Sequence, residues 1–225
     1  MKKKIIAIIL ARGGSKEIKN KNIIKINNKQ LIFWSIKSCL LSKLIDETWV
    51  TSDSNKILNI SEKYGAKILK RPKKYAKDNS SSESAWLHAI KHIDKNNFVK
   101  TIIGIQPTSP LRPKKCLDEA IMKFKKEKLD SLFSSQKIKD HFIWENKKKK
   151  LVPNYNYRKR KIRKKIKEKY LENGSFFIFD KRKFLINKCR FFGKIGTYSM
   201  GKIFSFQIDE NEDIKLFQNL KKYFK

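Results

Sequence analysis

The clearest candidate for chemistry in this sequence is a short basic, glycine-containing stretch that follows the first apolar run. Its residues are Ala11, Arg12, Gly13, Gly14, Ser15 and Lys16, with Lys21 and Asn22 shortly after. Adjacent glycines allow backbone N–H groups to converge on an anion, and the basic side chains supply charge. The spacing is neither that of a Walker A loop nor GxGxxG. The stretch predicts a phosphate-binding turn, and a plain tight turn is the alternative.

A second polar stretch, QPTSPLR at residues 106–112, follows another apolar run. Its two prolines restrict the backbone. They would hold the side chains of Gln106, Thr108 and Ser109 over one edge of a sheet, where binding loops usually lie. A rigid loop that caps the next helix explains the stretch equally well when it is considered alone.

The chain is strongly basic, with 55 Lys and Arg against 21 Asp and Glu and a formal net charge of +34. Only eight of the 55 are arginine, so 47 are lysine. A nucleic-acid interface favours arginine, whose fork binds guanine and phosphate bidentately. We therefore expect no nucleic-acid partner, although a nucleic-acid-binding protein is the alternative from another class. The net charge should raise the local concentration of anionic substrates. Because lysine is far more frequent than arginine in this chain, Arg12, Arg71 and Arg112 indicate positions where bidentate hydrogen bonding is needed.

The order of the predicted elements indicates an α/β fold. The continuous apolar run at residues 4–10 is typical of a parallel strand buried on both faces. Further strands are predicted at 47–51, 66–69, 101–106, 132–134, 142–144 and 175–179, and helices at 31–44, 55–64, 84–93, 115–126 and 212–224. This alternation predicts a doubly wound, mainly parallel sheet, with ligands beyond the carboxyl ends of the strands. The length of 225 residues fits a single domain, 1–225.

The sequence also bears on the location of the protein. No apolar run reaches the ~18 residues that a membrane helix needs, and the lysine-rich start lacks a cleavage-site pattern. We expect a cytoplasmic protein without a membrane partner. Cys39, Cys116 and Cys189 are odd in number and widely spaced, which favours free thiols.

Five segments together resemble the acylneuraminate cytidylyltransferases, also called CMP-sialic acid synthetases, and they occur in that family's order. They are residues 10–16 (LARGGSK) with 20–23 (NKNI), residues 71–72 (RP) with Ala76, Asp78, Ser82 and His88, and residues 106–112, 170–177 (YLENGSFF) and 208–213 (IDENED). The resemblance implies a Rossmann-like nucleotidyltransferase fold. It also implies that CTP is joined to an N-acylated nonulosonic acid, whose anomeric hydroxyl attacks the α-phosphorus, and that pyrophosphate is released. A Kdo-type eight-carbon acid is the alternative substrate.

The resemblance also implies roles for individual residues. The catalytic group would be Arg12, Lys16, Lys21 and Asp209. Nucleotide binding would fall to Ala11, Gly13, Gly14, Ser15, Asn22, Arg71, Asn79 and Ser82. Sugar binding would fall to Gln106, Thr108, Ser109, His141, Arg163, Tyr170 and Asn173. The implied cofactor is Mg²⁺, held by Asp209, since this ion typically combines one or two carboxylates with water and phosphate.

The chain departs from the family's pattern at two places. Residues 17–19 read EIK where the family commonly has GIP, and Gln207 stands where many members have an acid. One protein carboxylate is then left for the metal. This predicts either a weaker affinity for Mg²⁺ or a substrate carboxylate in the coordination position that the missing acid would fill. Taken alone, the acids at 209–213 are also typical of the first turn of a helix, and both interpretations can hold.

The basic segment 140–172 breaks the strand–helix alternation. By resemblance it is a dimerisation and substrate arm, so a homodimer is expected; a solvated basic segment is the alternative. His88 and His92 have the i, i+4 spacing of a metal pair, but no third ligand is apparent, and packed or surface positions are favoured.

Overall fold

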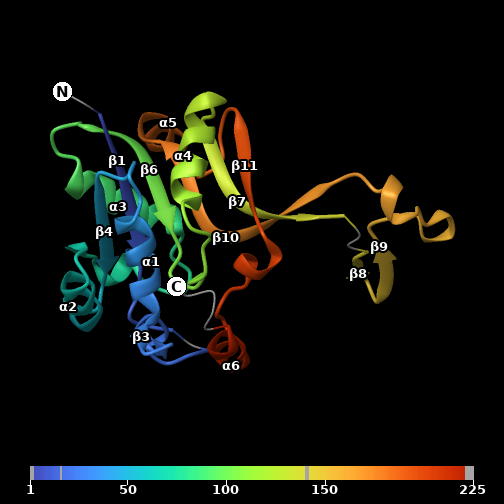
Figure 1. The fold of residues 1–225 in the computed structure, drawn as a ribbon, viewed down its shortest axis with the longest axis horizontal. Helices are drawn as coiled ribbons and strands as arrows, with labels where there is room; N and C mark the ends of the chain where they lie inside the picture. Colours follow the sequence, from blue (N-terminus) through green and yellow to red (C-terminus); the bar gives the residue numbers. More distant parts are fainter. Residues whose placement is uncertain (1–2, 16, 140–141, 221–225) are drawn as a thin grey trace.

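The computed structural model describes residues 3–15, 17–139 and 142–220. Its centre is a seven-stranded sheet in the order β11-β7-β10-β6-β1-β4-β5, in which only β10 runs antiparallel (Figure 1). The strands are β1 Lys4–Leu10, β4 Glu47–Ser52, β5 Lys67–Lys70, β6 Val99–Ile105, β7 Ser131–Ile138, β10 Lys169–Asp180 and β11 Ile195–Met200. Since β4 and β6 flank β1, the strand order reverses there. The predicted doubly wound, mainly parallel sheet is confirmed.

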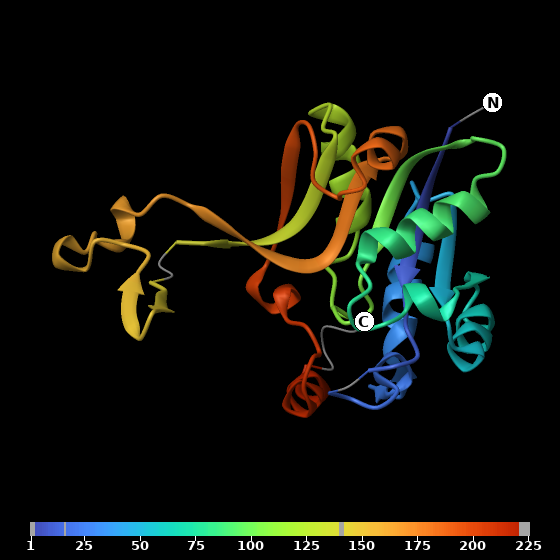
Figure 2. The same cartoon turned by 180° about the vertical axis from the view of Figure 1, so that it is seen from behind.

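Helices cover both faces of this sheet. They are α1 Leu31–Leu40, α2 Asn55–Lys63, α3 Ser82–Ile93, α4 Cys116–Lys126, α5 Lys181–Asn187 and α6 Asn211–Asn219. The ribbon views show helices on both sides of the sheet (Figures 1 and 2). Alternate residues of β1 point to opposite faces: Ile9 packs in the core with α1, α2 and α4, and Ile8 packs in the core with α3 and α5. The uninterrupted apolar run of β1 is explained by this burial on both sides.

A third, smaller core fastens the C-terminal segment to the N-terminal half. It joins Phe217 of α6 and Ile208 to Ile26 and Leu31, all of them buried. Ile26 belongs to the short ribbon of β2 Lys25–Ile26 and β3 Lys29–Gln30, and α6 lies close to this ribbon (Figure 1). The segment that carries Asp209 is therefore held at the same end of the sheet as the loop after β1.

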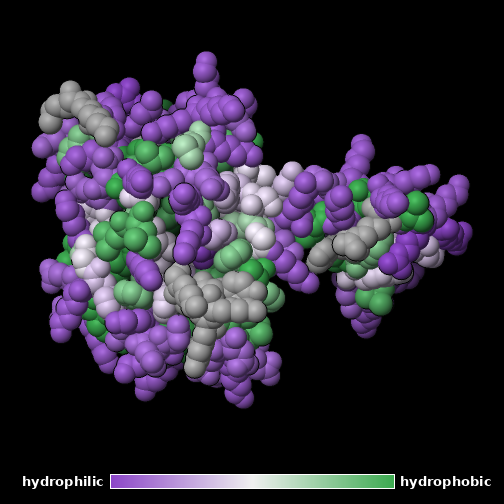
Figure 3. All heavy atoms as spheres, viewed as in Figure 1, coloured by the Kyte–Doolittle hydropathy of each residue, from purple (hydrophilic) through white to green (hydrophobic). Residues whose placement is uncertain are grey.

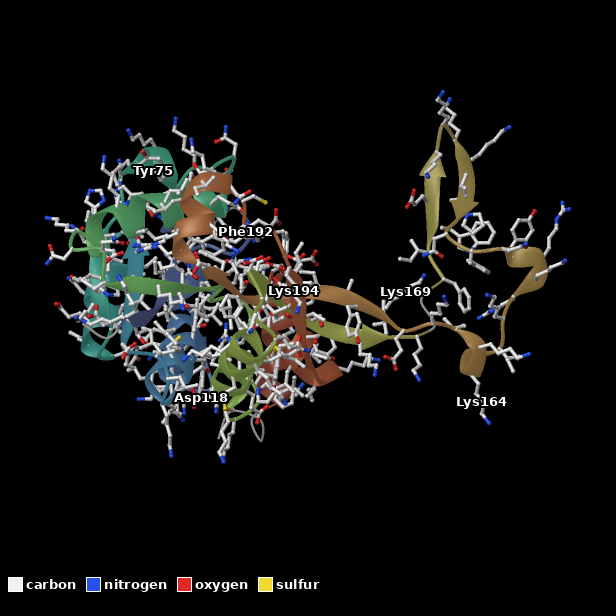
Figure 4. All side chains as sticks on the ribbon, turned by 90° about the horizontal axis from the view of Figure 1, so that it is seen from above. Tyr75, Asp118, Lys164, Lys169, Phe192 and Lys194 are labelled. Carbon is white, nitrogen blue, oxygen red and sulfur yellow. The ribbon has the colours of Figure 1, made fainter. Side chains whose placement is uncertain are left out.

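Between β7 and β10 the chain leaves the body as an arm (Figure 2). The arm contains a hairpin of β8 Trp144–Lys147 and β9 Lys150–Pro153 and two short 3-10 turns, η3 Tyr157–Lys159 and η4 Arg163–Lys165. Figure 4 shows Lys169 at its base and Lys164 farther out. Hydrophilic residues cover most of the face seen in Figure 3, on the body and on the arm.

Some elements differ from the sequence prediction. The strand expected at 142–144 begins only at Trp144, and within the described residues the last helix ends at Asn219. Neither α5 nor β11 was predicted. The seven residues of α5 are too few for a clear helical period, and β11 contains Gly196, whose absent side chain leaves room for Leu129. Among the described residues, no helix is both long and apolar enough to cross a membrane.

Candidate active site

The carboxyl ends of β1 and β6 open into a cleft of about 430 Å³. Its walls come from four parts of the chain that are distant in sequence. They include Arg12, Ser15, Lys21 and Asn22; Arg71, Tyr75, Asp78 and Ser82; Gln106 and Thr108; and Glu172, Gly174, Phe177, Arg190, Gln207 and Asp209. This is the place where a doubly wound sheet binds its ligands, and nine of the residues predicted from the sequence meet there.

The loop after β1 is anchored by hydrogen bonds to its neighbours. The N–H of Gly13 donates to Asp53 Oδ1 at 2.8 Å, and Asn22 Nδ2 donates to the carbonyl of Arg12 at 2.8 Å. A Cβ at Gly13 would lie 2.9 Å from Ser54 Cβ, whereas one at Gly14 would meet nothing within 4 Å. Gly13 is thus required where the loop passes Ser54, at the start of α2, and its N–H is bound to a carboxylate of the protein.

Three cationic side chains from different elements reach the cleft. Arg12 Nη1 lies 2.5 Å from Asp78 Oδ1, and Lys21 Nζ lies 3.0 Å from Asp209 Oδ1. Arg71 is buried, and this burial lowers its pKa to about 10 although Asp53 opposes the shift. Arg71 therefore remains charged at neutral pH. Together these groups form a site for a polyanion.

A buried arginine fixes the floor of the cleft. Arg112 Nη2 donates to the carbonyls of Gln106 (3.0 Å) and Ser175 (3.1 Å), and Nη1 donates to Ser35 Oγ at 3.1 Å. These bonds tie the loop after β6 to β10 and α1. Gln106 Nε2 in turn lies 3.4 Å from Ser82 Oγ, at the start of α3. Gln106 and Thr108 of this loop both line the cleft.

The C-terminal segment completes the cleft. The N–H of Ile208 donates to the carbonyl of Thr108, and Gln207 Nε2 donates to the carbonyl of Asn173, both at 2.8 Å. Asp213 Oδ2 accepts the N–H groups of Asp209 and Glu210 and so forms a capping box for α6. The acidic cluster therefore does cap a helix, while the carboxylate of Asp209 lines the cleft.

Other predicted site residues lie elsewhere or outside the description. The structure does not include Ala11, Gly13, Gly14, Asn79, Ser109, Tyr170 and Asn173 in the cleft walls. Asn173 is buried and bonded to Ser134 Oγ at 2.6 Å and Ser205 Oγ at 3.1 Å, so it supports the irregular part of β10. Lys16 and His141 lie outside the described residues, as does the side chain of Arg163.

Several cleft residues were not assigned roles from the sequence. They are Tyr75, Asp78, Glu172 and Arg190, with Asp53 just behind the loop. Asp53 directly follows β4, so the rule that ligands gather at strand ends could have indicated it. Arg190 follows α5, a helix that the sequence did not predict, and no signal pointed to it.

The donor set for a divalent ion is small. Within the described ranges, no three His, Cys, Asp or Glu side chains gather as a metal cluster. The carboxylate of Asp209 is nevertheless accessible, with 60% of its side chain exposed. In proteins Mg²⁺ keeps several water ligands and takes phosphate oxygens beside one or two carboxylates. Asp209 therefore fits an Mg²⁺ ion whose coordination shell is completed by phosphate oxygens of the substrate and by water. His88 and His92 lie with their ring centroids 4.2 Å apart.

Comparison with known proteins places the chain among nucleotide-transferring enzymes. A family model described as cytidylyltransferase matches residues 6–224. An N-acylneuraminate cytidylyltransferase from Escherichia coli is 33% identical over 96% of this chain and 52% of its own length. A pseudaminic acid cytidylyltransferase from Campylobacter jejuni is 32% identical over 77% of both proteins. The chain spans about half the length of the N-acylneuraminate cytidylyltransferases that it matches.

Solved structures agree on the fold. A CMP:2-keto-3-deoxy-manno-octonic acid synthetase complexed with CTP superimposes with a TM-score of 0.71 at 13% identity, covering 97% of this chain and 98% of that one. A 4-diphosphocytidyl-2C-methyl-D-erythritol synthase gives a TM-score of 0.72 at 10% identity, covering 98% and 99%. At such identities the likeness establishes the shared fold and no more.

Proposed function

Because the chain belongs to the cytidylyltransferase family, we propose that it transfers CMP from CTP to the anomeric hydroxyl of an N-acylated nonulosonic acid and releases pyrophosphate. The observation that carries this proposal is the convergence of Arg12, Lys21, Arg71 and Asp209 on one cleft at the carboxyl ends of the strands. The named substrates of two relatives, N-acylneuraminate and pseudaminic acid, support the choice of acceptor.

The cationic groups account for the nucleotide. A triphosphate carries several negative charges, and charge builds up further on the leaving pyrophosphate during transfer. Arg12 and Lys21 would donate charge-assisted hydrogen bonds to these oxygens, and the buried Arg71 would strengthen the local positive field. Arg12 and Lys21 pair with Asp78 and Asp209 in this structure. A bound triphosphate would replace these carboxylates as the acceptor of the hydrogen bonds that Arg12 and Lys21 donate.

The floor of the cleft would orient the acceptor. Transfer to the α-phosphorus needs the attacking hydroxyl on the side opposite the leaving group, and holding it there removes much of the entropic barrier. Gln106 and Thr108 lie on a loop that Arg112 and the carbonyl bond to Ile208 hold in place. Their side chains are the groups that we assign to positioning the sugar acid.

Asp209 would hold Mg²⁺, which would neutralise charge on the phosphates when bound. Gln207 could add only its carbonyl oxygen, because its NH₂ group donates to Asn173. The protein would thus offer one carboxylate and one neutral oxygen. We expect the ion to bind mainly together with CTP.

The arm would pair two subunits. Trp144, Leu151 and Ile162 are 46%, 67% and 63% exposed, and exposed apolar side chains on a projecting segment suit contact with a second chain. Within the pair, Arg163 and Tyr170 would approach the partner's sugar site. A single domain, a homodimer and a cytoplasmic location complete the proposal.

The test is a pyrophosphate-release assay with CTP, Mg²⁺ and a panel of nonulosonic acids that includes N-acylneuraminic and pseudaminic acids. A Kdo-type acid serves as the alternative acceptor, and UTP replaces CTP as the nucleotide control. We expect turnover with CTP and at least one N-acylated nine-carbon acid. Folded protein that turns over none of them would refute the proposal, and a preference for the eight-carbon acid would support the alternative.

A further inference from the structure

Two aspartates flank β4 and bind the two ends of β1, its neighbour in the sheet (Figure 1). Asp46 directly precedes β4, and its Oδ2 accepts the N–H of Ile5 at 2.7 Å. Asp53 directly follows β4, and its Oδ1 accepts the N–H of Gly13 at 2.8 Å. The two bonds are alike, but only Asp53 lies at the end of the sheet where the cleft opens.

The bond to Asp53 ends the backbone ladder between β1 and β4. The last backbone bond of this ladder runs from the N–H of Ala11 to the carbonyl of Thr51, at 3.1 Å. Since alternate residues of a parallel strand bond to the same neighbour, the next bond would run from Gly13 to the carbonyl of Asp53. The carboxylate of Asp53 replaces this carbonyl, which instead accepts Lys70 Nζ at 2.7 Å. The side chain of Asp53 therefore determines where the chain leaves the sheet.

The turn at Gly13 carries groups that we propose for triphosphate binding. Arg12 comes before Gly13 and Ser15 after it, and both line the cleft. Asn22 Nδ2 donates to the carbonyl of Arg12 at 2.8 Å, so the loop is held on its other side as well. A displacement of Gly13 would consequently move both of the cleft residues next to it.

Asp53 also lies close to a second cationic group of the cleft. The N–H of Arg71 donates to the carbonyl of Ser52 at 2.8 Å, which brings the start of this segment beside Asp53. Burial lowers the pKa of Arg71, and the negative charge of Asp53 opposes this shift. One carboxylate is thus a neighbour of both the loop after β1 and the buried arginine.

The position of Asp53 distinguishes it from Asp78, another carboxylate near these arginines. Asp78 pairs with the side chain of Arg12 and lines the cleft, where a triphosphate would replace it. Asp53 is not among the described residues that line the cleft. Its carboxylate binds a backbone N–H behind the loop, so this bond can persist when the nucleotide is bound. Asp53 is therefore suited to hold the loop in both states.

Given the proposed function, on which this inference rests, we infer that Asp53 is a positioning residue for CTP, which holds the N–H of Gly13 and so orients Arg12 and Ser15 toward the triphosphate. A loop that is fixed in advance loses less conformational entropy when its ligand binds. The main requirement at position 53 is an acceptor oxygen. Asparagine supplies this oxygen without the charge that also acts on Arg71, whereas alanine supplies neither.

The experiment measures the melting temperature and, by calorimetric titration in the presence of Mg²⁺, Kd for CTP. Asp53→Ala is compared with Asp53→Asn and with the matched control Asp46→Ala. Each alanine variant removes a carboxylate that accepts one backbone N–H, so the two should lower the melting temperature by similar amounts. We expect Kd for CTP to rise at least tenfold in Asp53→Ala, less than threefold in Asp53→Asn and less than twofold in Asp46→Ala. KM for the sugar acid at saturating CTP should change less than twofold in all three variants.

Equal effects of Asp53→Ala and Asp46→Ala on Kd for CTP would show that the bond to Gly13 does not position the loop. If Asp53→Ala does not fold, Asp53→Glu replaces it, because the longer side chain keeps the charge and displaces the acceptor. Asp53→Glu should then weaken CTP binding at least fivefold and more than Asp53→Asn, and the opposite order would overturn the inference.

The proposed function is tested separately by the unaltered protein. If the unaltered protein does not bind CTP, the proposed function and this inference both fail. If it binds CTP with the expected order among the variants but turns over none of the acids, the inference stands and the proposed acceptor is wrong.

Discussion

Lys21 and Asp209 are 188 positions apart in sequence, yet Lys21 Nζ lies 3.0 Å from Asp209 Oδ1. The bond joins the loop after the first strand to the segment before the last helix. It depends on the small core around Ile208 and Phe217, which holds that segment in place. Two groups proposed for the triphosphate and its metal ion are thus brought together by packing to which Phe217, a residue outside the motifs, contributes.

Asp209→Asn is expected to lower kcat at least 100-fold at saturating CTP, because the amide is a poor Mg²⁺ ligand. The melting temperature should change little, since 60% of the side chain is exposed. Asp213→Ala is the control, and it should lower stability while leaving kcat nearly unchanged. It removes the cap of α6, which should cost about 1 kcal/mol of stability and leave kcat within a few-fold. Full activity in Asp209→Asn would contradict the metal assignment.

The ion pair of Arg12 with Asp78 predicts an effect on CTP affinity. The two side chains are 36% and 47% exposed, so the pair contributes little to stability, about 0–1 kcal/mol. In Asp78→Asn the triphosphate no longer competes with a carboxylate for Arg12, and Kd for CTP should fall about two- to fivefold. In Arg12→Ala it should rise at least tenfold. Calorimetric titration with CTP measures both, and weaker binding in Asp78→Asn would show that the carboxylate assists the nucleotide.

Arg112→Lys tests the arginine beneath the floor of the cleft. Lysine cannot serve the carbonyls of Gln106 and Ser175 and the hydroxyl of Ser35 together, and the loss of such buried charge-assisted bonds should cost about 3 kcal/mol. Urea unfolding measures this loss. Ser35→Ala removes one bond only and should cost about 1 kcal/mol. Equal stabilities for the two variants would mean that Arg112 does not hold the loop.

Much of the fold could be predicted because its signals are local. The apolar run of β1 indicates burial on both faces, and the N-cap of α3 is visible as consecutive serines, of which Ser81 accepts the N–H of Ser84. The loop at residues 11–16 could be placed at a strand end by the general rule for such sheets. The residues at the end of the cleft that we propose for phosphate binding were therefore accessible to sequence reasoning.

The opposite end of the cleft was not accessible in this way. Arg190 is positioned by contacts with Glu83 and with the rings of Trp86 and Phe177 on other elements. Contacts between residues far apart in the sequence produce no periodic pattern from which they could be predicted. The contacts of Asn173 could not be predicted from the sequence either. Its contact with the sugar was inferred from a motif. In the structure its side chain forms hydrogen bonds with Ser134 and Ser205 inside the protein. A motif can indicate that a residue is important, but it does not indicate which atoms that residue contacts.

Glu47 predicts a dependence of stability on pH. Burial would raise the pKa of this carboxyl, but hydrogen bonds from Lys4, Trp49 and Lys67 outweigh it and lower the pKa from 4.5 to about 2. The folded state thus binds the proton less readily than the unfolded state. The stabilisation is complete above about pH 4.5 and is lost as the pH falls toward 2.

Urea unfolding of the unaltered protein and Glu47→Gln at pH 6 and pH 3 measures this contribution. The unaltered protein should be more stable at pH 6, and the difference should shrink at pH 3. Lys67→Gln, which removes one of the three donors, should show a smaller difference with the same dependence. A difference that is the same at both pH values would contradict the lowered pKa.

Gly104 of β6 predicts a steric effect on the core beneath the cleft. A Cβ at this position would lie 2.2 Å from Cζ2 of Trp86. Trp86 is fully buried, with the rings of Phe177, Phe179 and Phe184 centred 5.5–6.4 Å away, so it has little room to move. Overpacking a rigid core typically costs 1–3 kcal/mol.

Gly104→Ala should therefore lower the free energy of unfolding by about 3 kcal/mol, measured by urea titration. Gly14→Ala is the matched control, because a Cβ there meets nothing within 4 Å, and its stability should be unchanged. Unchanged stability in Gly104→Ala would show that α3 can move away from the sheet, and the fixed position of Glu83 would then be in doubt.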